Sequence, residues 1–336
     1  MLYLDALKFE PVANIIHTYI YIYIYHRKLV LLGDSLNLRN LLLEKYQLQP
    51  EYIATSVESN LKKGKEYRML SDFANKSDEY YICIPFLQYN ENLKKKIESY
   101  GYKEFKDFVF TYHKGITLPP GTKNYMDEYG NKVISTGSFQ VILLSVAGNN
   151  VVNVDDKVVA RGNSNIIMEE CGGEIQIEKD SRFGFDAHFE VFSHSKIFIH
   201  EKSSFANNFT ARASAGSVID IGRDSMFSYD IEMYAGDGHS IFDVESHERV
   251  NECYPHNEKN DIIIGQHVWA GLRCTILSGR IGKNSIIGAG AVVKGELPQN
   301  CVAVGNPAVV KKIGVTWSRN PYAKSIRECG EEFENI

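Results

Sequence analysis

The chain has 336 residues, 44% of them apolar and 24% charged, and a formal net charge of -5. This composition is that of a folded soluble protein and excludes a disordered or collagen-like chain, and the length allows two domains. Nucleic acid is not expected as a partner, because no run rich in lysine and arginine provides the positive charge that binds phosphates.

Six cysteines are spread widely along the chain, with no C-x-x-C pair and no histidine at zinc-finger spacing. We expect reduced thiols in a cytoplasmic protein, because disulfide frameworks belong to small proteins of oxidising compartments. The first residues include Asp5 and lack a basic segment before an apolar run, which predicts no signal peptide. No apolar run reaches the ~20 residues of a transmembrane helix, so no transmembrane segment is expected.

Residues 1–115 are predicted to form a small α/β domain of the Rossmann-like kind. The expected strands lie at 19–26, 28–34 and 80–86, and the expected helices at 35–48 and 90–101. Ser35 is placed to cap the first helix and Gly101 to end the second. Buried strands that alternate with helices indicate a parallel sheet.

The segment GDSL at 33–36 follows the first of these buried strands. A phosphate could bind at the start of the following helix, but the G-x-G-x-x-G spacing of a dinucleotide site is absent. GDSL also resembles the nucleophile block of GDSL esterases, whose later Asp-x-x-His pair is missing here. We therefore interpret Ser35 as a helix cap.

A repeat of 22 residues appears in the second half of the chain. The segments IQIEKDSRF at 175–183, IFIHEKSSF at 197–205 and IDIGRDSMF at 219–227 superimpose. From 264 to 298 the repeat tightens to six residues, and one unit, ILSGR at 276–280, is a residue short. Short strands repeated in this way cannot bury their apolar residues singly, so they stack as a parallel β-solenoid with three faces in each coil.

His239 stands in the octapeptide GDGHSIFD at 236–243. Extending the 22-residue repeat places it at the coil corner that Ser195 and Ser217 occupy in the two preceding coils. The same extension predicts that the next strand begins at Ile241. A histidine where the repeat has serine is either a catalytic base or a structural corner residue.

The charged segment 244–260 has no strand periodicity and interrupts the solenoid just after His239. Long excursions from a regular repeat are usually functional. We expect this one to fold over the histidine or over a neighbouring subunit, where it would exclude water from a reactive thioester.

The segment 262–313, which runs from IIIGQHVWAGLRCT to GNPAVVKKI, resembles the C-terminal signature of hexapeptide-repeat acyltransferases. Together with GDGHSIFD it is similar to the branch that O-acetylates sugars of capsules, lipopolysaccharides and exopolysaccharides. The resemblance covers about 175–317. It implies a left-handed parallel β-helix, acetyl-CoA as the co-substrate, and a homotrimer with active sites between subunits.

The expected fold is therefore mainly β, with a C-terminal left-handed parallel β-helix and a smaller N-terminal α/β domain. The expected boundaries are 1–115 for the α/β domain, 116–155 for a β-rich connecting segment, 156–317 for the β-helix with its excursion at 244–260, and 318–336 for a tail.

The chemistry of acetyl transfer suits His239 as a general base. A sugar hydroxyl must lose its proton as it attacks the thioester, and imidazole titrates near neutral pH. A carboxylate bonded to the other ring nitrogen would fix the tautomer and stabilise the imidazolium. The resemblance matches both Asp237 and Asp243 to the family motif, without saying which of the two orients the ring.

The resemblance also implies positions for acetyl-CoA. Small residues would let the pantetheine arm approach the backbone, and lysines would bind the nucleotide phosphates. Ala270 and Gly295 depart from the family pattern, and the alternative for the small residues is that they only close the turns of the coil. The positions carried over are Trp269, Gly271, Ala289, Lys294, and Lys311 or Lys312.

Other histidines are interpreted as structural or exposed. His267 occupies the turn position that Asp224 holds in the preceding coil, which favours packing over catalysis. His188, His194 and His200 lie six residues apart, a spacing that suggests a metal site, but we interpret them as surface residues and expect no metal.

We predict an O-acetyltransferase that moves acetyl from acetyl-CoA to a sugar hydroxyl of a cell-surface polysaccharide or its precursor. One alternative is an N-acetyltransferase of a nucleotide-linked amino sugar, against which the missing G-x-G-x-x-G counts. Another is a non-catalytic glycan-binding β-solenoid. The intact GDGHSIFD, followed by an excursion and the motifs for acetyl-CoA, counts against it.

Overall fold

The computed structural model describes the chain from residue 27 to residue 326 with several gaps. The gaps are 34–38, 40–48, 57, 85–90, 105, 111–114, 128–129, 145–147, 170–171, 215, 240 and 252–257. The contacts divide the chain into two compact units, with the main boundary after Gly115.

The N-terminal unit is built on a five-stranded parallel sheet with the strand order β3-β2-β1-β4-β5. The strands are β1 (Lys28–Leu32), β2 (Tyr52–Thr55), β3 (Tyr67–Met69), β4 (Tyr80–Ile84) and β5 (Phe108–Phe110). The helices are the 3-10 helices η2 (Glu58–Lys63) and η3 (Leu70–Phe73) and the α-helix α4 (Glu91–Ser99). The all-parallel pairing confirms the α/β prediction, and β1 and β4 confirm two of the predicted strands.

Helix α4 confirms the helix predicted at 90–101. It ends at Gly101, which has a φ of 86° and donates its N–H to Glu98 O at 2.9 Å. Outside the described residues lie the strand predicted at 19–26, the Ser35 cap, and the helix predicted at 35–48 apart from Arg39.

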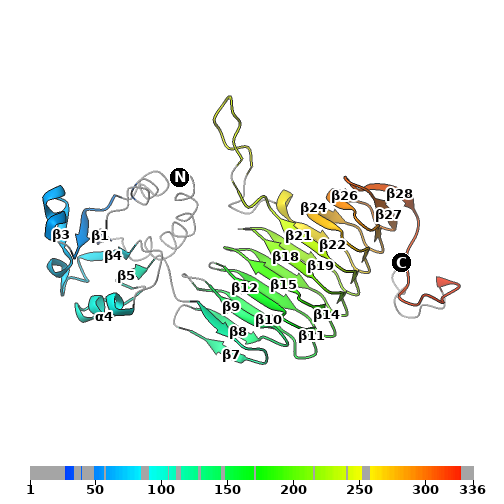
Figure 1. Cartoon of the computed structure of the whole chain (residues 1–336), viewed down its shortest axis with the longest axis horizontal. Coiled ribbons are helices and arrows are strands. Elements are labelled where there is room, and N and C mark those ends of the chain that lie inside the picture. The colour runs from blue at the N-terminus through cyan, green and yellow to red at the C-terminus, as the bar shows by residue number, and fades with distance from the viewer. Residues whose placement is uncertain are drawn as a thin grey trace. The chain divides into compact units, whose positions relative to one another are not determined.

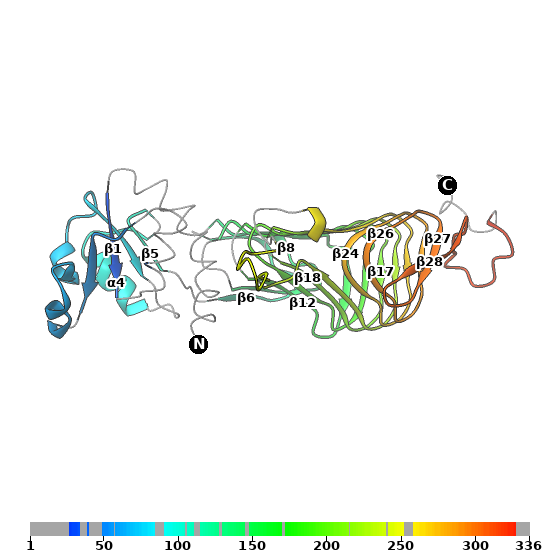
Figure 2. The same cartoon turned by 90° about the horizontal axis from the view of Figure 1, so that it is seen from above.

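The C-terminal unit is a parallel β-helix whose coils lie side by side along its axis (Figure 1 and Figure 2). Its parallel strands form three rows, one for each face of the coil. The first row contains β9 (Gln140–Leu143), β12 (Asn165–Met168), β15 (His188–Val191), β18 (Phe209–Ala213), β21 (Ile231–Ala235) and the first residues of β24 (Thr275–Ile281) and β26 (Val292–Leu297).

The second row contains β8 (Lys132–Ser135), β10 (Val151–Val154), β13 (Glu174–Ile177), β16 (Lys196–Ile199), β19 (Val218–Ile221), β22 (Ile262–Ile264) and the last residues of β24 and β26. The third row contains β11 (Val159–Arg161), β14 (Arg182–Phe185), β17 (Ser204–Phe205), β20 (Met226–Phe227), β23 (Trp269–Ala270), β25 (Ile286–Ile287) and β27 (Cys301–Val304). The parallel ladders thus reach back to β8 and β9, inside the segment 116–155.

Antiparallel strands close both ends of the rows. At the N-terminal end β6 (Ile116–Leu118) pairs with β9 and β7 (Lys123–Met126) pairs with β8. At the C-terminal end β28 (Val309–Ile313) pairs with β27. These strands cover edges that would otherwise expose unpaired backbone groups.

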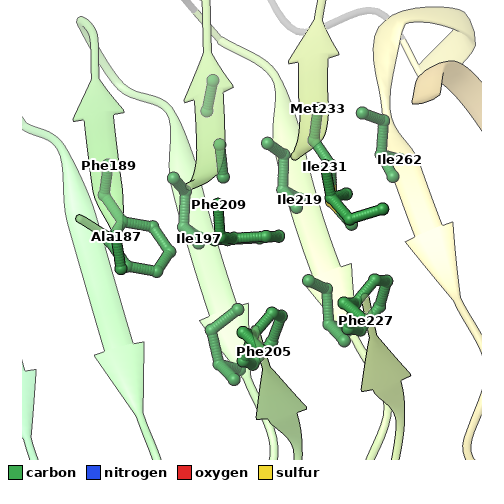
Figure 3. Packing of buried hydrophobic residues seen from close by; sticks show 14 of the residues in the cluster. Ala187, Phe189, Ile197, Phe205, Phe209, Ile219, Phe227, Ile231, Met233 and Ile262 are labelled. Carbon is green, nitrogen blue, oxygen red and sulfur yellow. The ribbon is translucent and has the colours of Figure 1, made fainter. Parts of the chain in front are cut away.

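The 22-residue repeat is confirmed by the register of the strands. Ile197 pairs with Ile219, and Phe183, Phe205 and Phe227 pair in succession. The three rings stack nearly parallel, with centroid distances of 4.5 and 4.8 Å, and Figure 3 shows Phe205 and Phe227 in this row. Each ring is buried, and burial of a phenylalanine side chain contributes roughly 1.5–3 kcal/mol to folding.

The shorter repeat near the C-terminus is also confirmed. Trp269 pairs with Ile286, and Ile262 pairs with Gly279, so this coil advances by 17 residues, whereas the next advances by 16, from Ile286 to Val302. Three units of six would give 18, and the missing residue is the one that ILSGR lacks.

The position predicted for His239 in the coil is wrong. Ile219 pairs with Ile262 in the next coil, so the residue next to Ser217 is Asn260 and not His239. The apparent continuation at Ile241 fails because the I-x-I pattern is not completed there. DIIIG at 261–265, in contrast, repeats the VIDIG pattern of the preceding coil.

The chain leaves the coil after Gly236, and residues 237–251, here called the arm, project from the β-helix as a hairpin (Figure 1). Val250 donates its N–H to Ile241 O at 2.9 Å, and Asp243 donates to Glu248 O at 2.9 Å. Ile241 is 49% exposed and therefore does not belong to the core strand predicted there.

The spacing between coils can be tested at two stacked glycines. Gly279 and Gly295 have φ values of 110° and 100°, so a side chain is strained at either. A Cβ at Gly279 would also collide with the carbonyl oxygen of Gly295, whereas a Cβ at Gly295 meets nothing within 4 Å. We expect Gly279→Ala to lower the free energy of unfolding by about 1–3 kcal/mol more than Gly295→Ala does. Thermal melts followed by circular dichroism measure the difference, and equal melts would contradict the register.

Candidate functional site

A cavity of about 490 Å³ opens where the arm leaves the β-helix. It lies at the corner between the first and second strand rows, where β24 bends as it passes from one row to the other. Its walls come from four successive coils and from the base of the arm. The lining residues are Arg212, Ser214, Tyr234, Gly236, Asp237, Gly238, His239, Lys259, Asn260, Leu277, Ser278 and Lys294.

His239 and Asp237 line this cavity together, which places two of the three predicted catalytic residues at one site. Both side chains are exposed. The main chain and not the ring of His239 is held by the arm, since its carbonyl oxygen accepts a hydrogen bond from Asn251 Nδ2 at 2.7 Å. Among the described residues, none forms a hydrogen bond or ion pair with the ring of His239.

Asp243 has a different environment from Asp237. Its Oδ1 accepts hydrogen bonds from the N–H of Ser246 at 2.7 Å, the hydroxyl of Ser246 at 3.0 Å and the N–H of Glu245 at 3.0 Å. These bonds, those from Ser246 above all, lower the pKa of the Asp243 carboxyl. Asp243 thus caps the turn of the hairpin and is absent from the cavity wall, so the structure separates the two aspartates.

Lys294 is the one proposed acetyl-CoA residue, of the six carried over, that lines the cavity. It lies on β26 beside Ser278 of β24. Trp269 lies instead in the third strand row and is 37% exposed. Lys311 and Lys312 lie exposed on β28.

Gly271 and Ala289 lie in the turns that follow β23 and β25. Gly271 donates its N–H to Ile287 O at 2.8 Å, and a Cβ at Gly271 would lie 2.8 Å from the amide nitrogen of Ala289. The close stacking of the two coils therefore requires the glycine, and the small side chain at 271 has a structural reason.

No sequence motif predicts Arg212, Tyr234 or Lys259 as site residues. Arg212 pairs with Glu190 at 3.1 Å between Nε and Oε2, and its guanidinium lies 4.7 Å from the ring centroid of Phe192. Burial above all raises the pKa of Tyr234. Glu190, Arg212 and Tyr234 follow one another at intervals of 22 residues, so they lie in one row on the outside of the β-helix. The 22-residue repeat could therefore have predicted that these three residues lie together.

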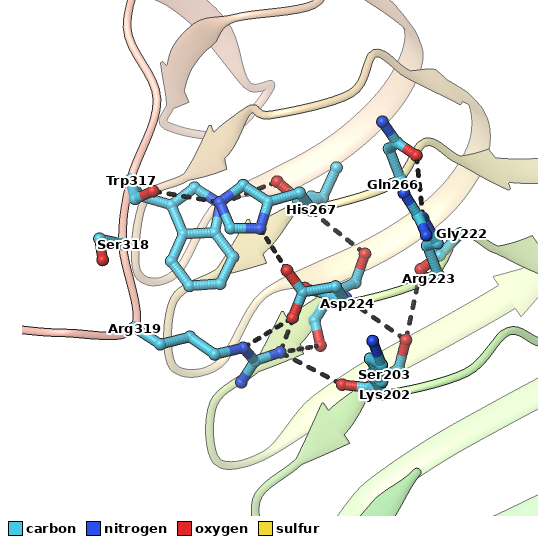
Figure 4. Close-up of polar contacts among 12 residues, drawn as sticks. Lys202, Ser203, Gly222, Arg223, Asp224, Gln266, His267, Trp317, Ser318 and Arg319 are labelled. Atoms are coloured by element: carbon cyan, nitrogen blue, oxygen red, sulfur yellow. Dashed lines mark hydrogen bonds and ion pairs between the residues drawn. The ribbon is translucent and has the colours of Figure 1, made fainter. Parts of the chain in front are cut away.

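His267 is confirmed as a structural residue. It is buried and takes the turn position of Asp224, with the same φ of 56°. Its Nδ1 lies 2.7 Å from Asp224 Oδ2 and its Nε2 lies 3.1 Å from Trp317 O, while the two rings stack at 4.2 Å (Figure 4). Arg319 Nε also pairs with Asp224 Oδ1 at 2.9 Å. These contacts bind the segment around Trp317 to the turn of the coil that carries Asp224.

His188 and His200 lie beside acidic side chains on the outside of the β-helix. His188 lies 2.9 Å from Glu190, and His200 contacts Glu178 and Asp220 at 3.2 and 3.1 Å. Among the described residues no group of three histidine, cysteine, aspartate or glutamate side chains is placed to hold a metal ion. Nor does the described part of the chain contain a helix long and apolar enough to cross a membrane.

Comparison with known proteins gives the family. No family model matches the sequence. The chain is 32% identical to the polysialic acid O-acetyltransferase of Escherichia coli O1:K1 / APEC over 155 residues. The aligned residues make up 46% of this chain and 48% of that protein. It is 31% identical to the polysialic acid O-acetyltransferase of Neisseria meningitidis over 166 residues. Here the aligned residues make up 47% of this chain and 72% of that protein. The chain belongs to the hexapeptide-repeat O-acetyltransferase family.

This membership confirms the resemblance seen in GDGHSIFD and in 262–313, and the β-helix is the left-handed kind of the family. The crystal structure of the polySia specific acetyltransferase NeuO aligns with a TM-score of 0.47 and 28% identity, over 60% of this chain and 85% of that chain. The chain spans about half the length of the Escherichia coli relative.

The contacts of Asp224 with His267 and Arg319 predict that the stability of the fold depends on pH. Burial alone would raise the pKa of Asp224, but hydrogen bonds from His267 and Arg319 outweigh it, so the pKa is lowered from its ordinary 3.8. The contacts of Asp224 therefore stabilise the fold fully above about pH 3.8, the ordinary pKa of the carboxyl. The stabilisation is lost as the pH falls through the lower pKa that Asp224 has in the folded protein.

We expect Arg319→Ala to lower the free energy of unfolding by about 1–2 kcal/mol at pH 7 and by less in acid, where the carboxyl is protonated. Thermal melts from pH 7 to pH 2.5 measure this. The control is Arg223→Ala, which removes an exposed arginine with one hydrogen bond of 3.3 Å to Gln266. If the loss of stability in Arg319→Ala stayed constant with pH, Asp224 would not be the partner through which Arg319 stabilises the fold.

Proposed function

We propose that this chain transfers acetyl from acetyl-CoA to a sugar hydroxyl of a cell-surface polysaccharide or its precursor. The observation that carries the proposal is that His239 and Asp237 share one open cavity, at the base of the arm, in a chain of the O-acetyltransferase family. The two relatives named as polysialic acid O-acetyltransferases support a polysaccharide acceptor.

The reaction needs a base that is accessible to the acceptor. The acceptor oxygen attacks the thioester carbonyl carbon while its proton passes to a ring nitrogen of His239. The tetrahedral intermediate then expels the CoA thiolate, which takes the proton from the imidazolium and leaves as the thiol. Asp237, which lines the same cavity, is the carboxylate we propose for orienting the ring and stabilising its charge, in preference to Asp243.

Positive charge around the cavity suits an anionic ligand. Arg212, Lys259 and Lys294 outnumber Asp237 among the charged residues of the wall. Lys294 is the residue we propose for the phosphates of acetyl-CoA, and Arg212 and Lys259 are the cations we propose to face an acidic glycan.

The proposed acetyl-CoA residues lie on different faces of the β-helix. Trp269 belongs to the third strand row, whereas Lys294 lies beside the corner of the first and second rows. We propose a homotrimer in which one subunit supplies the cavity and another supplies the face with Trp269, and a cytoplasmic location, where acetyl-CoA is available.

The first test is the removal of the proposed base. We expect His239→Ala to lower kcat by roughly a hundred- to ten-thousandfold, because the hydroxyl then keeps its proton as it attacks. The assay follows thiol release from acetyl-CoA with a panel of acidic and neutral oligosaccharides, and mass spectrometry of the product shows an ester. His200→Gln is the matched control, since His200 pairs with Glu178 and Asp220 on the second strand row. Wild-type turnover by His239→Ala would exclude this histidine as the base.

The second test separates the two aspartates. We expect Asp237→Asn to lower kcat by about a hundredfold or more, because an amide cannot stabilise the imidazolium. Asp243→Asn keeps an oxygen that accepts from Ser246 and Glu245, so we expect its kcat to stay within about threefold of wild type. The same assay measures both, and the reverse order of effects would assign the role to Asp243.

A further inference from the structure

One amide side chain joins the two ends of the arm. Asn251 Nδ2 donates to Asp237 Oδ2 at 2.9 Å and to the carbonyl oxygen of His239 at 2.7 Å. Asn251 Oδ1 accepts the N–H of Ile241 at 2.7 Å and the Nε–H of Arg249 at 3.4 Å. The side chain thus holds three points on the strand that carries both proposed catalytic residues.

The orientation of this amide follows from its partners. The N–H of Ile241 only donates, so it must face Oδ1, and the carbonyl oxygen of His239 and the carboxylate of Asp237 only accept, so they must face Nδ2. An amide has both functions, whereas a carboxylate of the same shape only accepts. The site therefore requires asparagine for its donor as well as for its size.

Asn251 takes the place of backbone pairing at the base of the hairpin. The ladder of the arm includes the hydrogen bond from Val250 N to Ile241 O at 2.9 Å, and Asn251 is the next residue toward the β-helix. Its side chain reaches back 10, 12 and 14 residues along the chain. It therefore fixes the segment between Gly236 and Ile241, which the in-register stacking of the coils does not hold.

We propose that Asn251 is a positioning residue for acetyl transfer, which holds the main chain at His239 and the carboxylate of Asp237 so that both face the cavity. It acts through these two residues, because it is not part of the cavity wall itself. The inference rests on the function proposed for His239 and Asp237.

The sharpest test is Asn251→Asp, which keeps the shape and the acceptor for Ile241 but turns a negative oxygen toward Asp237. We expect kcat to fall roughly ten- to a hundredfold, because two hydrogen bonds are replaced by repulsion and the ring is misplaced. The KM for acetyl-CoA is expected to stay within about threefold, since Asn251 touches none of the residues proposed for it. The acidic limb of the pH–rate profile moves to higher pH, because an added negative charge beside His239 favours the protonated ring.

The matched control is Asn208→Asp. Asn208 Nδ2 also donates to a carboxylate, Asp230 Oδ1 at 2.8 Å, at an exposed turn of the β-helix. The substitution makes the same chemical change away from the arm. We expect wild-type kcat and an unchanged pH profile.

A readout without turnover separates this inference from the proposed function. The titration of the His239 ring, followed by NMR, is expected to move to higher pH in Asn251→Asp and to stay in place in Asn208→Asp. If the wild type acetylates no glycan but the ring titration moves, the proposed function fails and the positioning role stands. If the wild type is active and Asn251→Asp matches Asn208→Asp in kcat and in ring titration, the positioning role is wrong. A lower kcat with unmoved titration and faster proteolysis of the arm would also overturn it, because Asn251 would then only stabilise the hairpin.

Discussion

The in-register stacking of coils is the constraint on which the rest of the β-helix depends. Backbone N–H and C=O groups of one coil bond to the next coil at matching positions, as between β13, β16 and β19. A residue added within a strand moves the following side chains to the other face, so a long insertion is best accommodated at a corner. The arm is inserted at such a corner, between β21 and β22, and the flanking strands keep their register with the coils on either side.

The same constraint explains what the sequence could predict. Apolar positions such as Ile197 and Phe205 recur because each must fill the interior of its own coil, so the period of 22 was visible in the letters alone. The extension to His239 failed because it counted residues instead of completed strands. At 241–243 the third residue is Asp243, whereas a strand of this row needs a second apolar residue, as Ile264 provides in 262–264. The pattern VIDIG followed by DIIIG contained the correct answer.

Within the site, local chemistry was easier to predict than tertiary contacts. Asp237, His239 and Asp243 could be predicted together because they lie in one short motif, and our proposal of Asp237 over Asp243 rests on the hairpin. Asp243 accepts from residues two and three positions later, which is the ordinary behaviour of an aspartate at a turn. Asn251 could not be found in this way, since its partners lie 10 to 14 residues away and depend on how the hairpin closes.

A β-helix separates groups that a compact enzyme would gather. Side chains on one strand row face away from those on another, so a single coil cannot bring Trp269 of the third row to the cavity between the first and second rows. The arm places His239 and Asp237 at a corner that the coils alone would fill with a short turn. It does not bring the third strand row any nearer to that corner. In the homotrimer that we propose, the other side of the site comes from a neighbouring copy that approaches the same corner. The exposed apolar residues of the arm, Ile241 and Phe242 among them, are placed to meet such a surface. The two requirements agree with an assembly of identical subunits, since each copy would present both the corner and the face that the neighbouring copy lacks.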